Sequence, residues 1–213
     1  MKSEHWHVLL ESRRAIRGAI DDVLSPEPPP GAPIGVGKRV GPEALQLLRE
    51  RLLNEILNLK SVLGHDLSEE QVDEVARPIT LHVDEMVKRR LSDQEQSQWR
   101  LLQRQFYGRD DGGEYFYDYA DEKLASPETP PLVFEVLHFC LTAGFVGRHA
   151  GNTARLREYK EKLARKIPKP EPRPPVAPKA PQERPIQEFP ILYYVVAGAI
   201  VFAVPVLLWG LSR

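Results

Sequence analysis

The chain has 213 residues, a formal net charge of −1 and a single cysteine, Cys140. The charge is uneven, because residues 1–156 hold 19 Lys and Arg against 25 Asp and Glu, whereas residues 157–184 hold nine against four. An acidic body lacks the basic face that binding to a phosphate backbone demands, so we expect no nucleic-acid partner. One cysteine excludes an internal disulfide and a cysteine-based zinc site. The first residues lack the apolar run of a signal peptide, and we expect none.

Apolar residues recur at helical spacing from the start of the chain. They predict a first helix over about residues 4–24, followed by a Pro- and Gly-rich loop over 25–41. A stripe of Leu and Ile over 45–63, separated by three or four residues, predicts a second helix. Pro42 near its start and Gly64 after its end are typical helix boundaries.

The third predicted helix covers residues 68–86. It opens with a capping box formed by Ser68 and Gln71, and we expect Pro78 to kink it. A shorter helix is predicted over 99–106, where Trp, Leu and Phe recur at helical spacing.

Three further helices are predicted in the C-terminal part of the body. One follows the Gly112-Gly113 break and carries several aromatic residues. The next starts near Thr129 and is apolar around nearly its whole circumference as far as Phe145, which predicts a central position. The last covers about 153–166 and is strongly charged. No segment shows strand alternation, so the sequence predicts an all-α bundle of about seven helices over residues 1–166.

Residues 191–211 form a 21-residue stretch without charge. At about 1.5 Å per residue, a helix of this length spans the roughly 30 Å hydrocarbon core of a bilayer. Lys and Arg gather on its N-terminal side, and only Arg213 lies beyond it. We therefore predict one transmembrane helix, with the body in the cytoplasm and the C-terminus outside. The alternative is a buried core helix. Ala199 and Ala203 have the spacing of small residues that lets two such helices pack, which favours a homodimer.

Between body and span, residues 167–190 are rich in proline. Such a segment favours extended polyproline II structure, so we predict a stalk that acts as a spacer. The alternative is a docking site for a proline-reading domain, for which Pro172, Pro175 and Pro178 have the required spacing.

Candidates for chemistry are few. Glu135 and His138 have the Glu-x-x-His spacing of half a carboxylate di-iron site, but the sequence lacks the other half. Cys140 lies in an apolar helix and is interpreted as a buried hydrophobe. The acidic loop before Glu114 lacks the ligand spacing of a calcium loop. The sequence therefore predicts no catalytic residue, no metal and no cofactor.

Asp84 and Glu85 are adjacent carboxylates beside the buried stripe of the third helix. They are either a solvated helix face or a negative patch that orients a basic partner. We predict on this basis that Asp84→Lys with Glu85→Lys leaves folding intact and weakens partner recruitment.

Several short motifs occur together, in this order: Ala76-Arg77, Val83-Asp84-Glu85-Met86-Val87, Trp99, Phe106-Tyr107-Gly108, Gly112-Gly113-Glu114-Tyr115-Phe116-Tyr117 and Glu135 to Arg148. In this order and with the terminal apolar helix, the chain resembles the DotU/IcmH/TssL family of bacterial secretion-system proteins. The resemblance extends over about residues 40–166. Its motif residues here are Gly112, Gly113, Glu114, Phe116, Glu135, Gly144, Phe145, Gly147 and Arg148.

The resemblance implies an inner-membrane scaffold of a type VI secretion system, or of the related type IVB system. It further implies a hook-like body of two small three-helix bundles, an IcmF/TssM-type membrane partner, and docking of the baseplate through a groove that contains Asp84 and Glu85. Two departures stand out. Arg109-Asp110-Asp111 replaces a Trp-Gly pair that often precedes the doubled glycine, and no peptidoglycan-binding extension is expected after Arg213.

The alternatives to this function are a tail-anchored metal-dependent enzyme and a tail-anchored adaptor outside secretion. Stoichiometric metal in the purified protein would favour the enzyme. A pull-down that recovered no IcmF/TssM-type protein would favour the adaptor.

Overall fold

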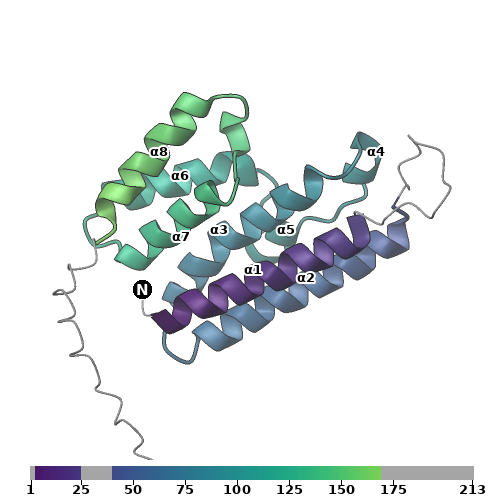
Figure 1. The fold of residues 1–213 in the computed structure, drawn as a ribbon, viewed down its shortest axis with the longest axis horizontal. Coiled ribbons are helices and arrows are strands. Elements are labelled where there is room, and N and C mark those ends of the chain that lie inside the picture. The colour runs from purple at the N-terminus through teal and green to yellow at the C-terminus, as the bar shows by residue number, and fades with distance from the viewer. Residues whose placement is uncertain (1–2, 25–39, 169–213) are drawn as a thin grey trace, which may run out of the picture. The chain divides into compact units, whose positions relative to one another are not determined.

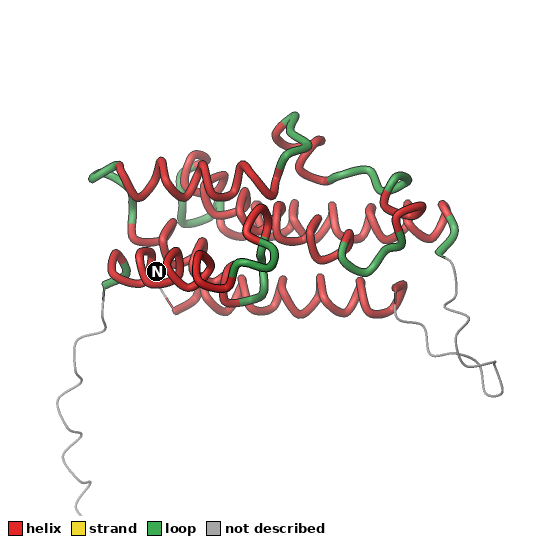
Figure 2. Tube along the Cα trace, turned by 90° about the horizontal axis from the view of Figure 1, so that it is seen from above, coloured by secondary structure: helices red, strands yellow, loops and turns green. Residues whose placement is uncertain are grey.

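The computed structural model describes residues 3–24 and 40–168, in which the regular structure is helical throughout (Figure 1). Figure 2 shows this part of the chain as helices joined by loops, without a strand. The all-α prediction is confirmed for these residues. The elements in chain order are α1 (Ser3–Leu24), α2 (Pro42–Leu63), α3 (Glu69–Lys88), α4 (Asp93–Gln96), α5 (Leu102–Tyr107), α6 (Gly112–Ala125), α7 (Pro131–Thr142), the 3-10 turn η1 (Gly147–His149) and α8 (Thr153–Lys166).

The described residues therefore form eight α-helices, where the sequence predicted seven. The additional helix is α4, which has only four residues and is held by a capping box between Ser92 and Glu95. A helix this short shows no hydrophobic periodicity, so the capping box was its only signal in the sequence.

Two predicted boundaries were wrong. The apolar helix predicted as far as Phe145 ends at Thr142, because Gly144 takes a φ of +109° and turns the chain away. The helix predicted from Trp99 begins only at Leu102. Trp99 instead lies buried in the connection that leads into α5.

The long helix α3 lies at the centre of the body. Figure 1 shows α1 and α2 side by side on one side of α3, and α6, α7 and α8 on the other. α3 also packs against α5. The sequence predicted this central position for the apolar helix α7, which instead packs between α3 and α8.

The predicted stripe of α2 is confirmed as its buried face. All six members are at most 3% exposed: Leu45, Leu48, Leu52, Ile56, Leu59 and Leu63. Burying each such side chain contributes roughly 1.5–3 kcal/mol, so this stripe is a principal attachment between α2 and its neighbours. The capping box at the start of α3 is also confirmed, with Ser68 and Gln71 exchanging two hydrogen bonds.

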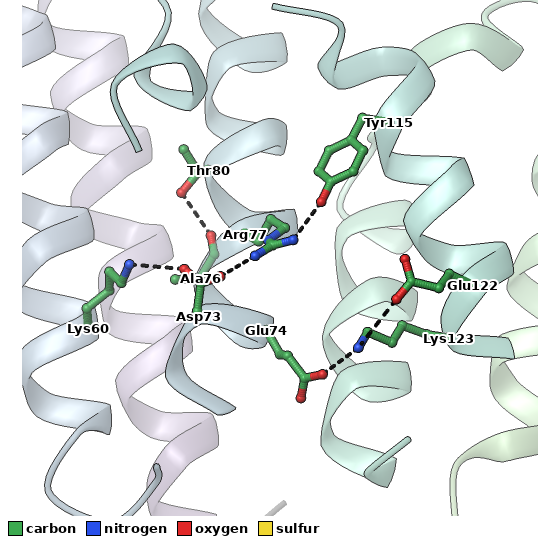
Figure 3. Close-up of polar contacts among 9 residues, drawn as sticks. All are labelled: Lys60, Asp73, Glu74, Ala76, Arg77, Thr80, Tyr115, Glu122 and Lys123. Atoms are coloured by element: carbon green, nitrogen blue, oxygen red, sulfur yellow. Dashed lines mark hydrogen bonds and ion pairs between the residues drawn. The ribbon is translucent and has the colours of Figure 1, made fainter. Parts of the chain in front are cut away.

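Polar contacts join α3 to the helices on both of its sides (Figure 3). Lys60 of α2 pairs with Asp73 of α3 at 3.3 Å. On the opposite side, Lys123 of α6 pairs with Glu74 of α3 at 2.6 Å. These ion pairs are partly buried, so they are screened less than exposed ones and help to fix the side-by-side placement of the helices.

Pro78 lies inside α3, which continues through it from Glu69 to Lys88. One turn of this region carries an additional bond, in which the Thr80 hydroxyl donates to the carbonyl of Ala76 at 2.8 Å. The kink predicted at Pro78 stays a prediction.

Within residues 3–24 and 40–168, no helix combines the length and the apolar character needed to cross a bilayer. The transmembrane helix predicted over 191–211 lies outside the described residues, as does nearly all of the stalk predicted over 167–190. The body predicted over 1–166 ends where α8 ends, at Lys166.

Candidate functional site: a groove beside the central helix

A groove of about 530 Å³ runs beside the C-terminal half of α3. Its other walls come from the start of α6 and from the loop that follows α7. Among its lining residues are Asp84, Glu85 and Lys88 of α3, Asp110 and Gly113 near the start of α6, and Gly147 of the loop. The groove thus brings together the acidic pair and two of the glycine motifs on which the family resemblance rests.

Asp84 is an internal residue at the floor of this groove. It is 2% exposed, and its carboxylate accepts three hydrogen bonds. The donors are the indole N–H of Trp99 at 3.0 Å and the backbone N–H groups of Leu102 at 2.9 Å and Gln103 at 2.8 Å. Leu102 and Gln103 are the first two residues of α5. Asp84 therefore caps the N-terminus of α5 from a neighbouring helix, where a negative charge is favourable.

This geometry excludes the solvated helix face, one of the two alternatives for Asp84. Replacing it with Lys would set an ammonium group against three donors and bury an unpaired charge. The burial of Asp84 therefore argues against the prediction that the double Lys substitution leaves folding intact. The role of Asp84 and Glu85 in partner binding stays a prediction.

Glu85 holds the loop after α7 against α3. Its carboxylate accepts the backbone N–H groups of Val146 at 3.1 Å and Gly147 at 3.0 Å. Arg89, one turn further along α3, lies 3.8 Å away. The side chain of Glu85 is 16% exposed, so this carboxylate, unlike that of Asp84, keeps contact with solvent in the groove.

The two carboxyl groups have raised pKa values for the same reason. Burial penalises the charged form of Asp84 and raises its pKa, while the bonds from Gln103, Leu102 and Trp99 oppose that rise. Burial likewise raises the pKa of Glu85 against the opposing bonds from Val146 and Gly147. Both carboxylates are occupied by N–H donors of the protein, so neither is placed as a general base.

The motif glycines allow two backbone segments to touch. A Cβ atom on Gly147 would lie 2.6 Å from the carbonyl oxygen of Gly113 and 3.0 Å from the Phe145 ring, and Gly147 has a φ of +48°. Only glycine fits such a close approach at a left-handed φ. Gly112 and Gly113 are the first residues of α6, so they start this helix and do not merely break the chain.

The remaining motif residues of α6 and the loop support the same wall of the groove. Phe116 and Phe145 are fully buried and stack with ring centroids 4.1 Å apart. Arg148 pairs with Asp118 at 2.6 Å and with Glu114 at 3.6 Å, both on α6. The carbonyl of Gly144 accepts a bond from Arg89 at 3.0 Å. The residues of each pair are separated by about thirty positions in sequence, or by 55 for Arg89 and Gly144, and the fold brings them together.

Glu135 lies away from this groove. Its carboxylate accepts the indole N–H of Trp6 at 3.1 Å, which ties α7 to α1. His138 is partly exposed on the same helix, and burial with the nearby Lys160 lowers its pKa. Across the part of the chain that the structure describes, no three His, Cys, Asp or Glu side chains come close enough to hold a metal. Cys140 is buried, and burial raises the pKa of its thiol.

Sequence reasoning missed the rim of the groove. Lys88 and Asp110 are exposed beside it, and Gln103 is buried against it. The helical period carried a signal for Lys88, which follows Asp84 by four residues and so lies on the same face of α3. The sequence held no comparable signal for Asp110 or Gln103, because only tertiary contacts bring them to this place.

The chain matches a known protein family over most of its length. Residues 36–213 match the family described as type VI secretion system protein DotU. The chain belongs to the DotU family. The match confirms the resemblance and extends beyond the residues on which it rested, through to Arg213. DotU proteins are structural components of secretion systems and are not a known enzyme family.

Two solved structures are similar to this chain, and the first of them supports the fold. The structure of DotU from Francisella novicida matches with a TM-score of 0.56 and 22% identity, covering 78% of this chain and 99% of that one. SciP/TssL from enteroaggregative Escherichia coli 042 matches with a TM-score of 0.48 and 21% identity, covering 81% of this chain and 98% of that one. A comparison with curated protein sequences gave no match.

Proposed function

We propose that this DotU protein is a non-enzymatic scaffold of the type VI secretion apparatus that docks the baseplate through the groove beside α3. The observation that carries the proposal is the arrangement around Glu85, a carboxylate that is 16% exposed in a groove of about 530 Å³ with charged residues at its rim. The volume suits an inserted side chain or short segment of a partner. The family match, whose description names type VI secretion, favours that system over type IVB.

In this proposal Asp84 and Glu85 have different tasks. Asp84 fixes the start of α5 and keeps the floor of the groove in place. Glu85 keeps a small contact with solvent and fixes Val146 and Gly147 at the opposite wall. Lys88 and Asp110, which are exposed at the rim, make the charged contacts that orient a partner and set its association rate.

The rim residues make a sharp test, because their side chains are exposed and their substitution leaves the core unchanged. Lys88→Glu combined with Asp110→Lys reverses both charges without altering the net charge. Arg51→Glu combined with Asp22→Lys is the matched control, since both residues are exposed and lie outside the groove. Affinity purification from solubilised inner membrane, with quantitative identification of retained proteins, gives the readout.

We expect the groove variant to retain at least about tenfold less of the baseplate components than the unmodified chain. This difference is equivalent to about 1.4 kcal/mol of binding free energy. The control should retain them. Equal recovery with both variants would contradict docking through this groove.

The membrane arrangement is part of the same proposal. The uncharged stretch over 191–211 would cross the inner membrane once, with the body in the cytoplasm, the proline-rich segment over 167–190 as a spacer, and an IcmF/TssM-type protein as partner in the bilayer. Ala199 and Ala203 would pack two copies together. Alkaline phosphatase fused after Arg213 should be active, because it would reach the periplasm. Activity of a cytoplasmic reporter at that position would contradict this topology.

A further inference from the structure

A second pocket, on the opposite side of α3 from α6, is lined by four arginines. We call it the arginine pocket and define it by Arg13 and Arg17 of α1, His82 of α3, and Arg89 and Arg90 directly after the end of α3. Its volume is about 290 Å³, and Ala143 and Gly144 after α7 close one side. Among the residues that the structure describes, no carboxylate lines this pocket. Four positive charges around one small pocket repel each other, and this body is otherwise acidic.

The arginines are only partly neutralised by the protein. Arg90 pairs with Asp21, and Arg89 lies 3.8 Å from Glu85 and donates to the carbonyl of Gly144. Within the described part of the chain, Arg13 and Arg17 form no ion pair. The guanidinium of Arg13 lies over the ring of Phe139, 5.3 Å from its centroid, and its buried Nε–H has no acceptor among the described residues.

His82 adds a buried polar group to the same pocket. It is 6% exposed, and neither ring nitrogen has a hydrogen-bond partner within the part of the chain that the structure describes. Burial, with smaller contributions from Arg13, Arg89 and Arg17, lowers its pKa to about 4. The ring is therefore neutral at pH 7 and offers one N–H donor. Buried polar groups are normally paired, so an unpaired ring at the wall of a pocket indicates a ligand.

We propose that the arginine pocket binds a phosphate group, carried either by a small soluble phosphate ester or by the headgroup of an anionic phospholipid. Guanidinium groups donate pairs of parallel N–H bonds that match phosphate oxygens. The donors converge from α1 and from the C-terminal end of α3, so a tetrahedral phosphate accepts from both sides through its terminal oxygens, three in a monoester and two in a diester. A carboxylate holds its two oxygens in one plane with its carbon and matches this arrangement less well.

Arg17 provides the cleanest variant, because it is exposed and its loss leaves the core intact. Arg14→Gln is the matched control, since Arg14 is exposed on the same helix, carries the same charge and does not line the pocket. Isothermal titration calorimetry of the full-length chain in a non-ionic detergent, at constant ionic strength, would use inorganic phosphate, glycerophosphoglycerol and glutamate as probes. Thermal unfolding of each variant checks that the fold is kept.

We expect saturable 1:1 binding of a phosphate probe, about tenfold weaker in Arg17→Gln and changed less than twofold in Arg14→Gln. Ring signals of His82 in the NMR spectrum should shift with the same saturation curve, which a merely structural arginine would not cause. Tighter binding of inorganic phosphate supports a soluble ester as the source, and tighter binding of glycerophosphoglycerol supports a lipid headgroup. The proposal fails if neither phosphate probe saturates, if glutamate binds as tightly, or if Arg14→Gln weakens binding as much as Arg17→Gln.

Discussion

The carboxylate of Asp84 accepts the indole N–H of Trp99 at 3.0 Å, so a charged side chain of α3 fixes the chain where it turns into α5. The same carboxylate caps the first two backbone N–H groups of α5. An acidic residue that lines a groove can thus be required for the fold itself. Substitutions of Asp84 therefore change stability, whatever their effect on the docking that we propose.

Asp84→Asn should lower the free energy of unfolding by about 3 kcal/mol. Asparagine keeps one acceptor oxygen but turns an NH₂ group toward backbone donors, which leaves buried groups unpaired. Urea denaturation of the purified full-length chain measures the change. Asp22→Asn, at an exposed position of α1, should change stability by less than about 0.5 kcal/mol. Similar effects of the two substitutions would contradict the buried role of Asp84.

Gly147→Ala should destabilise the body by about 3 kcal/mol and loosen the wall of the groove. The new methyl group would meet the carbonyl oxygen of Gly113 at 2.6 Å, in addition to the cost of a φ of +48°. Gly108→Ala separates these two causes, because Gly108 has a φ of +65° with no atom within 4 Å of the added Cβ. We expect Gly108→Ala to cost only about 1 kcal/mol. Equal melting temperatures for the two variants would show that the close approach of Gly113 and Gly147 is absent.

Arg77 links α3 to α6, and its loss should cost about 2–3 kcal/mol. Its guanidinium pairs with Asp73 and donates to the Tyr115 hydroxyl at 2.6 Å (Figure 3). It also lies over the ring of Tyr107, 5.1 Å from the centroid. A double-mutant cycle of Arg77→Met and Tyr115→Phe should give a coupling energy of about 1 kcal/mol. Additive effects would mean that the bond across the helix interface contributes nothing. Arg51→Met, on an exposed face of α2, is the control.

His82 should make the protein less stable at mildly acidic pH. Burial lowers its pKa to about 4 from an ordinary 6.5, so the unfolded chain binds a proton that the folded chain does not. The contribution of the neutral His82 ring to the free energy of unfolding is complete above pH 6.5 and is lost as the pH falls toward 4. Between pH 7.5 and 5.0 the loss from His82 alone is about 2 kcal/mol.

The raised pKa values of Asp84 and Glu85 act in the opposite direction, because folded carboxyl groups that bind protons more readily gain stability as the pH falls. Comparison with His82→Phe therefore isolates the histidine, since both proteins keep the two carboxyl groups. The wild-type chain should lose about 2 kcal/mol more than His82→Phe between pH 7.5 and 5.0, measured by urea denaturation. Parallel pH profiles would mean that His82 binds its proton as readily in the folded chain as in the unfolded chain.

Local interactions explain what the sequence determined by itself. The stripe of α2 and the capping box of α3 depend on residues three or four positions apart, so they could be predicted without a partner element. The all-α class and the bounds of α8 follow from the same periodicity. The ordered motifs were also sufficient to identify the family, because residue types and their order require no coordinates.

Only the tertiary structure decided which carboxylate faces inward. Helical rotation places Asp84 and Glu85 on different flanks of α3, but the direction in which each flank points depends on α5 and on the loop after α7, which are distant in sequence. The same holds for the arginine pocket, in which α1 and α3 bring together charges about seventy positions apart. Such contacts depend on how whole helices pack, and the pattern of one helix contains no information about the side chains that its neighbours present.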